Sequence, residues 1–233
     1  WQVVVMFFNV PTYIFPTPLK VFDALVNQRQ VIFTNALVTI VEALFGFLLA
    51  NSISVIAVLI IYLNKKFAGV IIPFAIVIKT MPIIAIVPLL TIWLGSGMPS
   101  KVVAAMLICF FPSLVNILRG IKSLDIELLW LFKVYSANKL QTIKKLILPN
   151  ILPYLFAALK TSSSLAVVGA LVGEFIGSNK GLGFLIMSNY YNMNTPLVFA
   201  AIITSSIFGI SFYYLIHFFE ERMNFDKRKI EEC

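Results

Sequence analysis

The chain has 233 residues, of which 60% are hydrophobic and 12% are charged, and its formal net charge is +8. A soluble domain could not cover its surface with so few polar side chains, so the composition predicts a protein that lies in a lipid bilayer. The apolar stretches are too long and too unalternating for barrel strands, and the two cysteines have neither the number nor the spacing of a disulfide framework or a metal site. We therefore predict an all-α, polytopic membrane protein with one transmembrane domain over residues 1–233.

Six hydrophobic segments follow one another along the chain. Five of them can each cross a hydrocarbon core of about 30 Å, whereas the first cannot, because ten helical residues rise only about 15 Å. We expect the first segment to be the end of a truncated span, giving about six transmembrane helices; a short interfacial segment is the alternative. The third segment contains three prolines and is expected to be bent or broken. The segments are Trp1–Val10, Phe33–Leu63, Phe67–Leu94, Val102–Leu118, Ile151–Ile176 and Leu197–Phe219.

The second segment carries a polar stripe. Asn35, Thr39, Glu42 and Gly46 are spaced by four, three and four residues and therefore share one face of a helix. A carboxylate within a span is costly unless it faces protein or water, so this face is not expected to contact lipid. Two interpretations stay open for Asn35, Thr39 and Glu42: the wall of a solute pathway, or a polar seam packed against a neighbouring helix.

Between Arg119 and Pro153 the chain becomes polar and basic. On a helix, Ala137, Leu140, Ile143 and Ile147 share one face, which predicts a short amphipathic helix outside the bilayer. The Leu-Pro pairs at Leu148-Pro149 and Leu152-Pro153 are expected to end this helix and to start the next apolar run, because proline is tolerated in a first turn but breaks a helix interior. The rest of the helix surface is polar: Asn138, Lys139, Gln141, Thr142, Lys144 and Lys145.

The fifth segment contains two charged residues and a glycine pair. Lys160 is expected either to line an inner vestibule of the pathway or to extend toward the cytoplasm, and Glu174 either to line the pathway or to reach the outer headgroups. Gly169 and Gly173 have the G-x-x-x-G spacing that allows two helices to approach closely. That approach could form a seam between two copies of the chain or the core of one subunit.

The basic residues indicate how the spans are oriented, because short loops rich in Lys and Arg stay on the cytoplasmic side. Twelve basic residues fall in connections that we assign to the cytoplasm, including the segment Arg119–Pro149 and the C-terminus. Four others, Lys20, Arg29, Lys101 and Lys180, fall in the expected outer loops. This membrane topology accounts for the net positive charge, so no nucleic-acid partner is expected.

The stretch that ends at Pro149 resembles a loop of the permease subunits of binding-protein-dependent ABC importers. That loop reads E-A-A, three residues, G, nine residues, I-x-L-P. Here Trp130-Leu131-Phe132 occupies the E-A-A positions, Ser136 the glycine and Leu146 the isoleucine, while Leu148-Pro149 matches. Serine adopts the left-handed conformation less readily than glycine, which puts the turn geometry in question. Four further blocks resemble the nitrate, sulfonate and taurine branch, which includes permeases for thiamine precursors and riboflavin: FPTPLKVFDAL, PIIAIVPLLTIWLGSG, FFPSLVNILRGIKSLD and LPYLFAALKTSSSLAVVGALVGEFIGSNKGLGFLI.

The resemblance implies partners and a mechanism. A second permease copy, two ABC ATPase subunits and an extracytoplasmic solute-binding protein would assemble with this chain in a bacterial inner membrane and move a solute by alternating access. The chain has no G-x-x-x-x-G-K-[ST] loop, so ATP and Mg²⁺ are expected on the ATPase, with no cofactor, metal or catalytic residue on this chain. Leu140 and Ile143 would anchor the ATPase. The residues assigned to ATPase coupling are Ser136, Ala137, Asn138, Lys139, Leu140, Gln141, Ile143, Lys144, Leu148 and Pro149.

Two questions remain open at this point. The amphipathic helix could instead lie on the inner leaflet with its lysines toward anionic lipid. The expected solute is a thiamine pyrimidine precursor or a riboflavin-like compound, with a nitrate, sulfonate or taurine permease as the alternative. A secondary transporter is a further alternative, but such proteins usually show internal repeats, and none is visible in this sequence.

Overall fold

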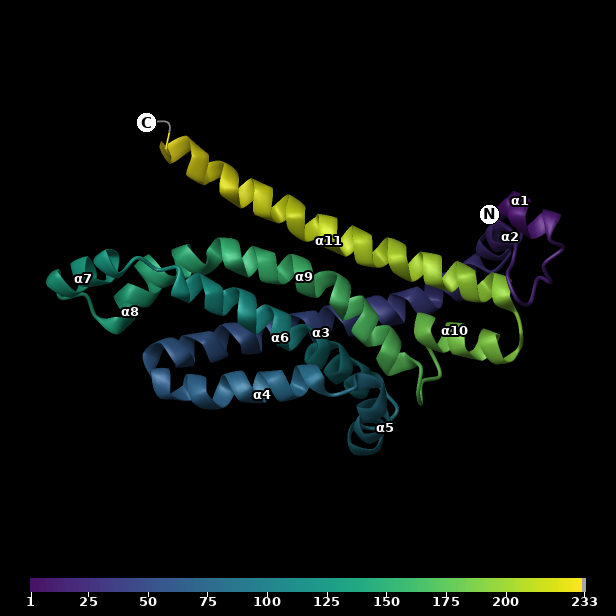
Figure 1. Cartoon of the computed structure of the whole chain (residues 1–233), viewed down its shortest axis with the longest axis horizontal. Coiled ribbons are helices and arrows are strands. Elements are labelled where there is room, and N and C mark those ends of the chain that lie inside the picture. The colour runs from purple at the N-terminus through teal and green to yellow at the C-terminus, as the bar shows by residue number, and fades with distance from the viewer. Residues whose placement is uncertain (232–233) are drawn as a thin grey trace.

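Four long apolar helices run along the longest axis of the molecule (Figure 1). The computed structural model describes the backbone of residues 1–231 and the side chains of residues 1–223, and this part of the chain contains helices and no strands. The helices long enough to cross a membrane are α3 (Arg29–Leu63), α6 (Met98–Lys122), a helix over Lys139–Glu174 and α11 (Thr195–Glu231). The prediction of an all-α, polytopic membrane protein is confirmed.

The third predicted segment is broken, as its prolines indicated. It consists of α4 (Ala68–Thr80), preceded by the short 3-10 helix η1 (Lys65–Phe67), and of α5 (Ile83–Leu94), and the two parts are bent by 101°. The break lies at Met81, whose backbone is extended with φ −67° and ψ 130°. Proline disfavours the helical conformation in the residue before it, so Pro82 explains where the helix ends. If this bent pair counts as one span, the described residues give five spans. The first predicted segment contains only α1 (Gln2–Phe7), so it adds none.

Small residues bring α3, α6 and the helix α9 (Leu148–Glu174) close together. A Cβ atom added to Gly169 would lie 2.6 Å from the Ala105 Cα, and one added to Gly46 would lie 2.5 Å from the Ala105 Cβ. Gly173 fits against the Lys101 backbone in the same way, at 3.0 Å. These contacts lie within one chain. The G-x-x-x-G pair therefore belongs to the core of the subunit, which was one of its two predicted roles.

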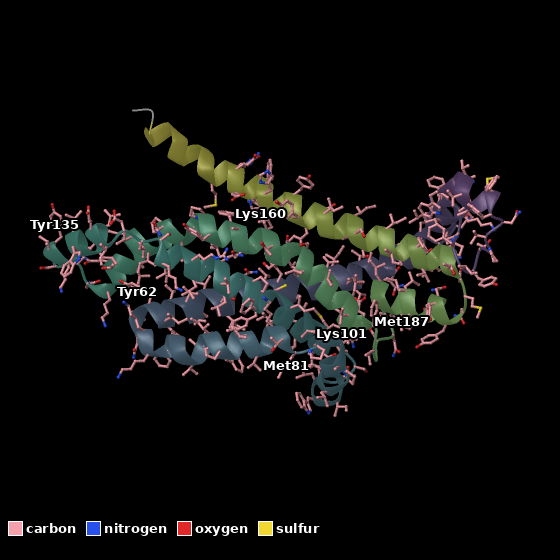
Figure 2. The ribbon with its side chains drawn as sticks, in the orientation of Figure 1. Tyr62, Met81, Lys101, Tyr135, Lys160 and Met187 are labelled. Carbon is pink, nitrogen blue, oxygen red and sulfur yellow. The ribbon has the colours of Figure 1, made fainter. Side chains whose placement is uncertain are left out.

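The two ends of the bundle carry different elements. Helices α7 (Ile126–Val134) and α8 (Lys139–Thr142) lie at one end (Figure 1). At the other end lie α1, α2 (Pro18–Asn27) and α10 (Leu182–Tyr191). Tyr62 and Tyr135 both lie toward the first end in Figure 2, so the Lys65–Lys66 connection, which follows Tyr62 closely in the chain, lies toward this end as well. The lysine-rich connections predicted to face the cytoplasm thus lie at one end.

The predicted amphipathic helix does not stop at Leu148-Pro149, so that expectation is wrong. It continues from α8 through the π-helical turn η2 (Ile143–Ile147) into α9. The Leu148 N–H donates to the Ile143 carbonyl, five residues earlier instead of four. Pro149 has no N–H and therefore cannot donate to the Lys145 carbonyl, and the wider turn accommodates this missing bond.

Candidate functional site

Helix α7 presents apolar side chains outward, and the sequence did not lead us to expect this helix. Asp125 caps it by accepting a hydrogen bond of 2.9 Å from the Glu127 N–H. Val134 and Tyr135 are 78% and 77% exposed, and Leu140 on α8 is 60% exposed. Such exposed side chains at a lysine-rich end mark a surface that can bind a partner. We define the α7–α8 surface as Ile126, Trp130, Leu131, Val134, Tyr135 and Leu140, each of which is exposed.

The turn between α7 and α8 has the left-handed geometry expected at the position where the family pattern has glycine. The Ala137 N–H donates to the Phe132 carbonyl and the Ser136 N–H to the Lys133 carbonyl, both at 3.0 Å. This pair of bonds is the Schellman motif, whose residue after the helix cap is left-handed. Ser136 occupies that position with φ +51°. The serine therefore keeps the turn that glycine would favour, and it does so in a conformation that L-residues adopt at a cost.

Helix α8 begins with a capping box. The Gln141 N–H donates to the Asn138 Oδ1 at 2.8 Å, and the Asn138 N–H donates to the Gln141 Oε1 at 2.9 Å. These two side chains, predicted to contact a partner, are thus also used to start the helix. Lys139 and Lys144 are exposed, as are Leu148 and Pro149 where α9 begins.

The predicted apolar face of this helix divides between two environments. Ile147 is fully buried, and Ile143 is half-buried against the core formed with α3 and α6. Leu140 points away from that core and is exposed, and Ala137 is half-buried. Of the two predicted anchors, Leu140 is therefore free to contact a partner, whereas Ile143 mainly packs against its own subunit.

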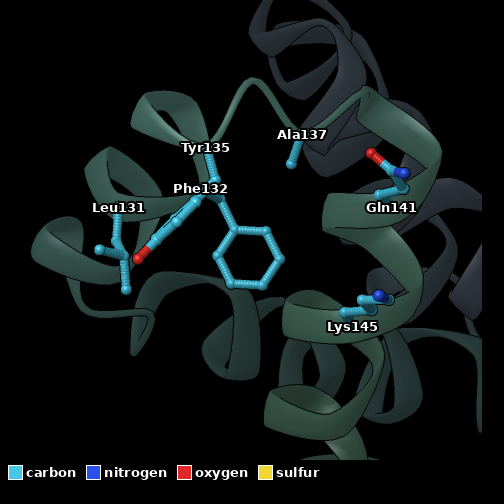
Figure 3. A pocket seen from close by; sticks show the side chains of 6 residues that line it. All are labelled: Leu131, Phe132, Tyr135, Ala137, Gln141 and Lys145. Atoms are coloured by element: carbon cyan, nitrogen blue, oxygen red, sulfur yellow. The ribbon is translucent and has the colours of Figure 1, made fainter.

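A hollow of about 360 Å³ lies between α7 and the α8–η2 segment. In Figure 3, one wall is formed from α7 and its end, the opposite wall from α8 and η2, and Ala137 lies on the loop between them. The hollow combines aromatic rings with an amide and an ammonium group, so it can accept an apolar side chain with a polar or acidic group beside it. The lining residues are Leu131, Phe132, Tyr135, Ala137, Gln141 and Lys145.

Three of the polar residues predicted to line a pathway lie in a second site, at the opposite end of the bundle. Asn35 Oδ1 accepts from the Gly181 N–H, and Thr39 Oγ1 from the Leu182 N–H, both at 2.8 Å. Glu174 Oε2 accepts from the Gly183 N–H at 2.6 Å. Three successive amides at the start of α10 are therefore held by side chains from α3 and α9. This is the place where a helix has free N–H groups and attracts an anion.

The same site contains a second carboxyl group and a buried lysine. Glu174 Oε1 also accepts from the Thr39 hydroxyl at 2.7 Å, and Glu42 lies next to Glu174. Lys101 is fully buried, with its Nζ donating to the Ser96 and Gly177 carbonyls. We had expected Lys101 in an outer loop, and that expectation is wrong, since α6 already begins at Met98. Its ammonium group is near enough to Glu42 and Glu174 to interact with their charges, and its carbonyl partners follow the C-terminal ends of α5 and α9.

Lys160 lies apart from the other four predicted pathway residues. Its Nζ is 2.6 Å from the Glu220 Oε2, so the pair joins α9 to α11. Figure 2 shows Lys160 and Lys101 at different positions along the bundle. For Asn35, Thr39, Glu42 and Glu174 the geometry is that of a packed seam, because three of them are buried and Asn35 bonds to the turn before α10. We call these four residues, Lys101 and the amides of Gly181–Gly183 the polar seam.

A comparison with protein families shows which family this chain matches. Residues 43–225 match the family described as the binding-protein-dependent transport system inner membrane component. The chain belongs to this family. It is thus a permease of an ABC importer, a transport component with several membrane spans. The predicted resemblance is confirmed.

Individual relatives cover most of the permease. It is 33% identical over 219 residues to a riboflavin transport system permease protein of Chloroflexus aurantiacus, covering 92% of this chain and 81% of that protein. It is 30% identical over 211 residues to a formylaminopyrimidine transport permease protein of Halalkalibacterium halodurans, covering 90% and 84%. A putative aliphatic sulfonates transport permease protein of Bacillus subtilis is also 30% identical, over 212 residues, with 90% and 76% covered.

A solved structure agrees with the fold. The permease superimposes with a TM-score of 0.60 on a chain of the MetNI methionine ABC transporter in an inward-facing conformation, covering 83% of this chain and 93% of that one. The sequence identity is 20%, so this likeness concerns the fold alone. The predicted branch, which contains sulfonate, thiamine-precursor and riboflavin permeases, is represented among the relatives.

Proposed function

We propose that this permease imports its solute by ATP-driven alternating access and that a cytoplasmic ABC ATPase binds the α7–α8 surface. The observation that carries this proposal is the exposure of Val134, Tyr135 and Leu140 at the lysine-rich end of the bundle. An apolar surface of this kind suits a groove on a soluble partner. The ATP and Mg²⁺ would be bound by that partner.

Within this surface the predicted coupling residues take different roles. Leu140 would enter the ATPase groove, with Lys139 and Lys144 at its edge, while Ala137 and Gln141 would form part of the hollow. Asn138 and Gln141 keep the start of α8 in place, and Ser136 sets the turn. Ile143 would act from inside, by fixing α8 to the subunit's own core.

The continuous helix offers a route for coupling. Because α8 passes through η2 into α9 without a break, a displacement of Leu140 by the ATPase would be carried directly into a membrane span. Leu148 and Pro149 lie where this span begins. In a bundle packed as closely as α6 and α9 are at Gly169, such a displacement would move helices as rigid bodies.

The proposal includes an orientation and further partners. The α7–α8 end and the C-terminus would face the cytoplasm, and α10 would face the opposite side, where a solute-binding protein would deliver the solute. A second copy of the permease would complete the pathway between two subunits. We propose that the polar seam supports the wall of that pathway from behind and that Lys160 holds α11 beside it through Glu220.

Substitution of Leu140 tests the ATPase contact. Leu140→Asp places a charge on the exposed surface and should reduce co-purification of the ATPase at least tenfold, because loss of a buried apolar anchor together with burial of an unpaired charge costs well over about 1.4 kcal/mol. Leu63→Asp is the matched control, since Leu63 is also an exposed leucine at the lysine-rich end but lies outside the α7–α8 surface. Equal ATPase recovery with both variants would contradict the proposal.

For the solute, we propose a nitrogen heterocycle such as a thiamine pyrimidine precursor or a flavin. The support is the similarity to permeases named for formylaminopyrimidine and riboflavin. A sulfonate is the alternative, since a relative named for sulfonates is about as similar. Uptake by the reconstituted importer should be competed by an aminopyrimidine or riboflavin and not by an alkanesulfonate; competition by the sulfonate alone would favour the alternative.

A further inference from the structure

The polar seam contains more acidic groups than basic ones. Glu42 and Glu174 are 3% and 1% exposed, and Lys101 is fully buried and interacts with both. If all three groups were charged, the seam would hold one unbalanced negative charge inside a membrane protein. An unbalanced buried charge is expensive because the interior cannot solvate it as water does. One additional positive charge is needed for balance.

The hydrogen bonds show which carboxyl group carries the negative charge. Glu174 accepts from the Thr39 hydroxyl and from the Gly183 N–H, so both of its oxygens have donors. Hydrogen bonds to a carboxylate stabilise its charged form. Glu42 receives no such donor within the described side chains, and its Oε2 is buried without any hydrogen-bond partner. These contacts therefore stabilise the ionised form of Glu174, whereas Glu42 has no donor to stabilise its ionised form.

The carboxyl groups of Glu42 and Glu174 also contact each other. They are within hydrogen-bonding reach of each other. Two ionised carboxylates are both acceptors and cannot form this bond, whereas a protonated carboxyl group can donate to an ionised one. A proton on Glu42 therefore supplies the missing bond and the missing charge together. The unpartnered Oε2 is then a neutral carbonyl oxygen, which costs less to bury than half of a negative charge.

We propose that Glu42 and Glu174 bind a single proton between them, Glu42 as the neutral acid that donates and Glu174 as the charged acceptor, and that this proton locks the turn Gly177–Gly183 onto α3. Asn35 and Thr39 of α3 already accept from the Gly181 and Leu182 N–H groups. Glu174, which the proton would tie to Glu42 of α3, accepts from the Gly183 N–H. Loss of the proton would place two negative charges side by side and loosen this hold. The lock lies at the α10 end of the bundle and does not depend on ATPase docking.

The surroundings of Glu42 limit which groups can affect this proton. The charged groups that face it are Glu174 from α9 and Lys101 from α6. A hollow of about 260 Å³ beside Glu42 is also lined by Lys180, Ser96 and Ser178. Helix α10 contributes backbone amides to the seam and no charged side chain.

Infrared spectroscopy tests the proton directly in the purified permease. The difference spectrum of the wild type minus Glu42→Gln at neutral pH should contain the carbonyl stretch of one protonated carboxylic acid, shifted in D₂O. Glutamine at position 42 is a neutral donor of similar shape, so it should fold and should lack this band. Absence of the band from the difference spectrum would overturn the proposal. Glu174→Gln leaves one carboxyl group beside Lys101, so Glu42 should ionise to balance the lysine and the band should be lost from this variant as well; a band that persists in Glu174→Gln would mean that Glu42 is protonated independently of Glu174 and would overturn the shared proton.

The locking role needs a separate measurement. Because the folded seam would hold this proton and the unfolded chain would release it, the stability that it provides is largest in acid and declines as the pH rises, so the thermal midpoint of the wild type should fall further with pH than that of Glu42→Gln. The titrating groups outside the polar seam are shared by both proteins and therefore cancel in this comparison. Identical profiles for the two proteins would overturn the lock. The infrared band and the pH profile can both be read from the wild type and Glu42→Gln even if Glu174→Gln does not fold.

Discussion

At the α7–α8 end of the bundle, apolar side chains such as Val134 and Leu140 face outward, whereas at the α10 end charged groups such as Lys101 and Glu174 are buried. Each arrangement is unfavourable for an isolated subunit unless something compensates for it. For the polar seam the compensation is internal, since its N–H, hydroxyl and ammonium donors bond to side-chain oxygens of Asn35, Thr39 and Glu174 and to the Gly177 carbonyl. For the α7–α8 surface it would come from a partner. The first region would thus serve assembly, whereas the second holds one subunit together, so substitutions should act on different properties.

The largest expected effect is that of removing the lysine from the polar seam. Lys101→Met would leave the carboxyl groups of Glu42 and Glu174 without their cation and should lower the free energy of unfolding by about 3–5 kcal/mol. The measurement is the thermal midpoint of the purified permease in one detergent. Lys20→Met is the control, because Lys20 is an exposed lysine on α2 at the same end and should change stability by less than about 0.5 kcal/mol. Equal midpoints for the two variants would mean that Lys101 does not compensate the seam.

A medium effect is expected at the glycine where α10 begins. Gly181 has φ +105° and ψ 163°, a region that is open essentially to glycine alone, and an added Cβ would overlap the Glu174 carboxylate. Gly181→Ala should therefore destabilise the permease by about 1–3 kcal/mol. Gly209→Ala is the matched control: Gly209 lies in α11, and a Cβ added there would have nothing within 4 Å, so alanine should be neutral or stabilising. Equal thermal midpoints for Gly181→Ala and Gly209→Ala would mean that the turn is not held as tightly as its contacts indicate.

The sequence predicted those features that depend on neighbours along the chain. Helix lengths, the proline break after Met81 and the shared face of Asn35, Thr39 and Glu42 all follow from local rules. It did not predict that Lys101 is buried, because its partners at Ser96, Gly177 and the two glutamates come together only when α3, α6 and α9 pack. Periodicity also does not tell which face of an amphipathic helix its own subunit covers, and so Ile143 was expected to be as free as Leu140.

Helix α7 was missed for a related reason. Its sequence has apolar residues on all sides and no clear stripe, and exposed apolar side chains such as Val134 have no local signal that separates them from a buried core. The Asp125 cap was the signal that could have located its start. The left-handed turn at Ser136 was correctly identified as the position where the family pattern has glycine, although its conformation was in doubt.

The smallest expected effect concerns that turn and sharpens the contrast between the two regions. Because serine adopts φ +51° at a cost, Ser136→Gly should stabilise the α7–α8 connection by up to about 1 kcal/mol, seen as slower hydrogen exchange of the amides around Ala137. Ser123→Gly, at a capping serine with φ −83°, should give no such gain, since no left-handed strain is present there. The polar seam should keep its exchange rates in both variants. Slower exchange at Gly181–Gly183 as well would mean that the two ends are coupled through the bundle more tightly than their separate contacts imply.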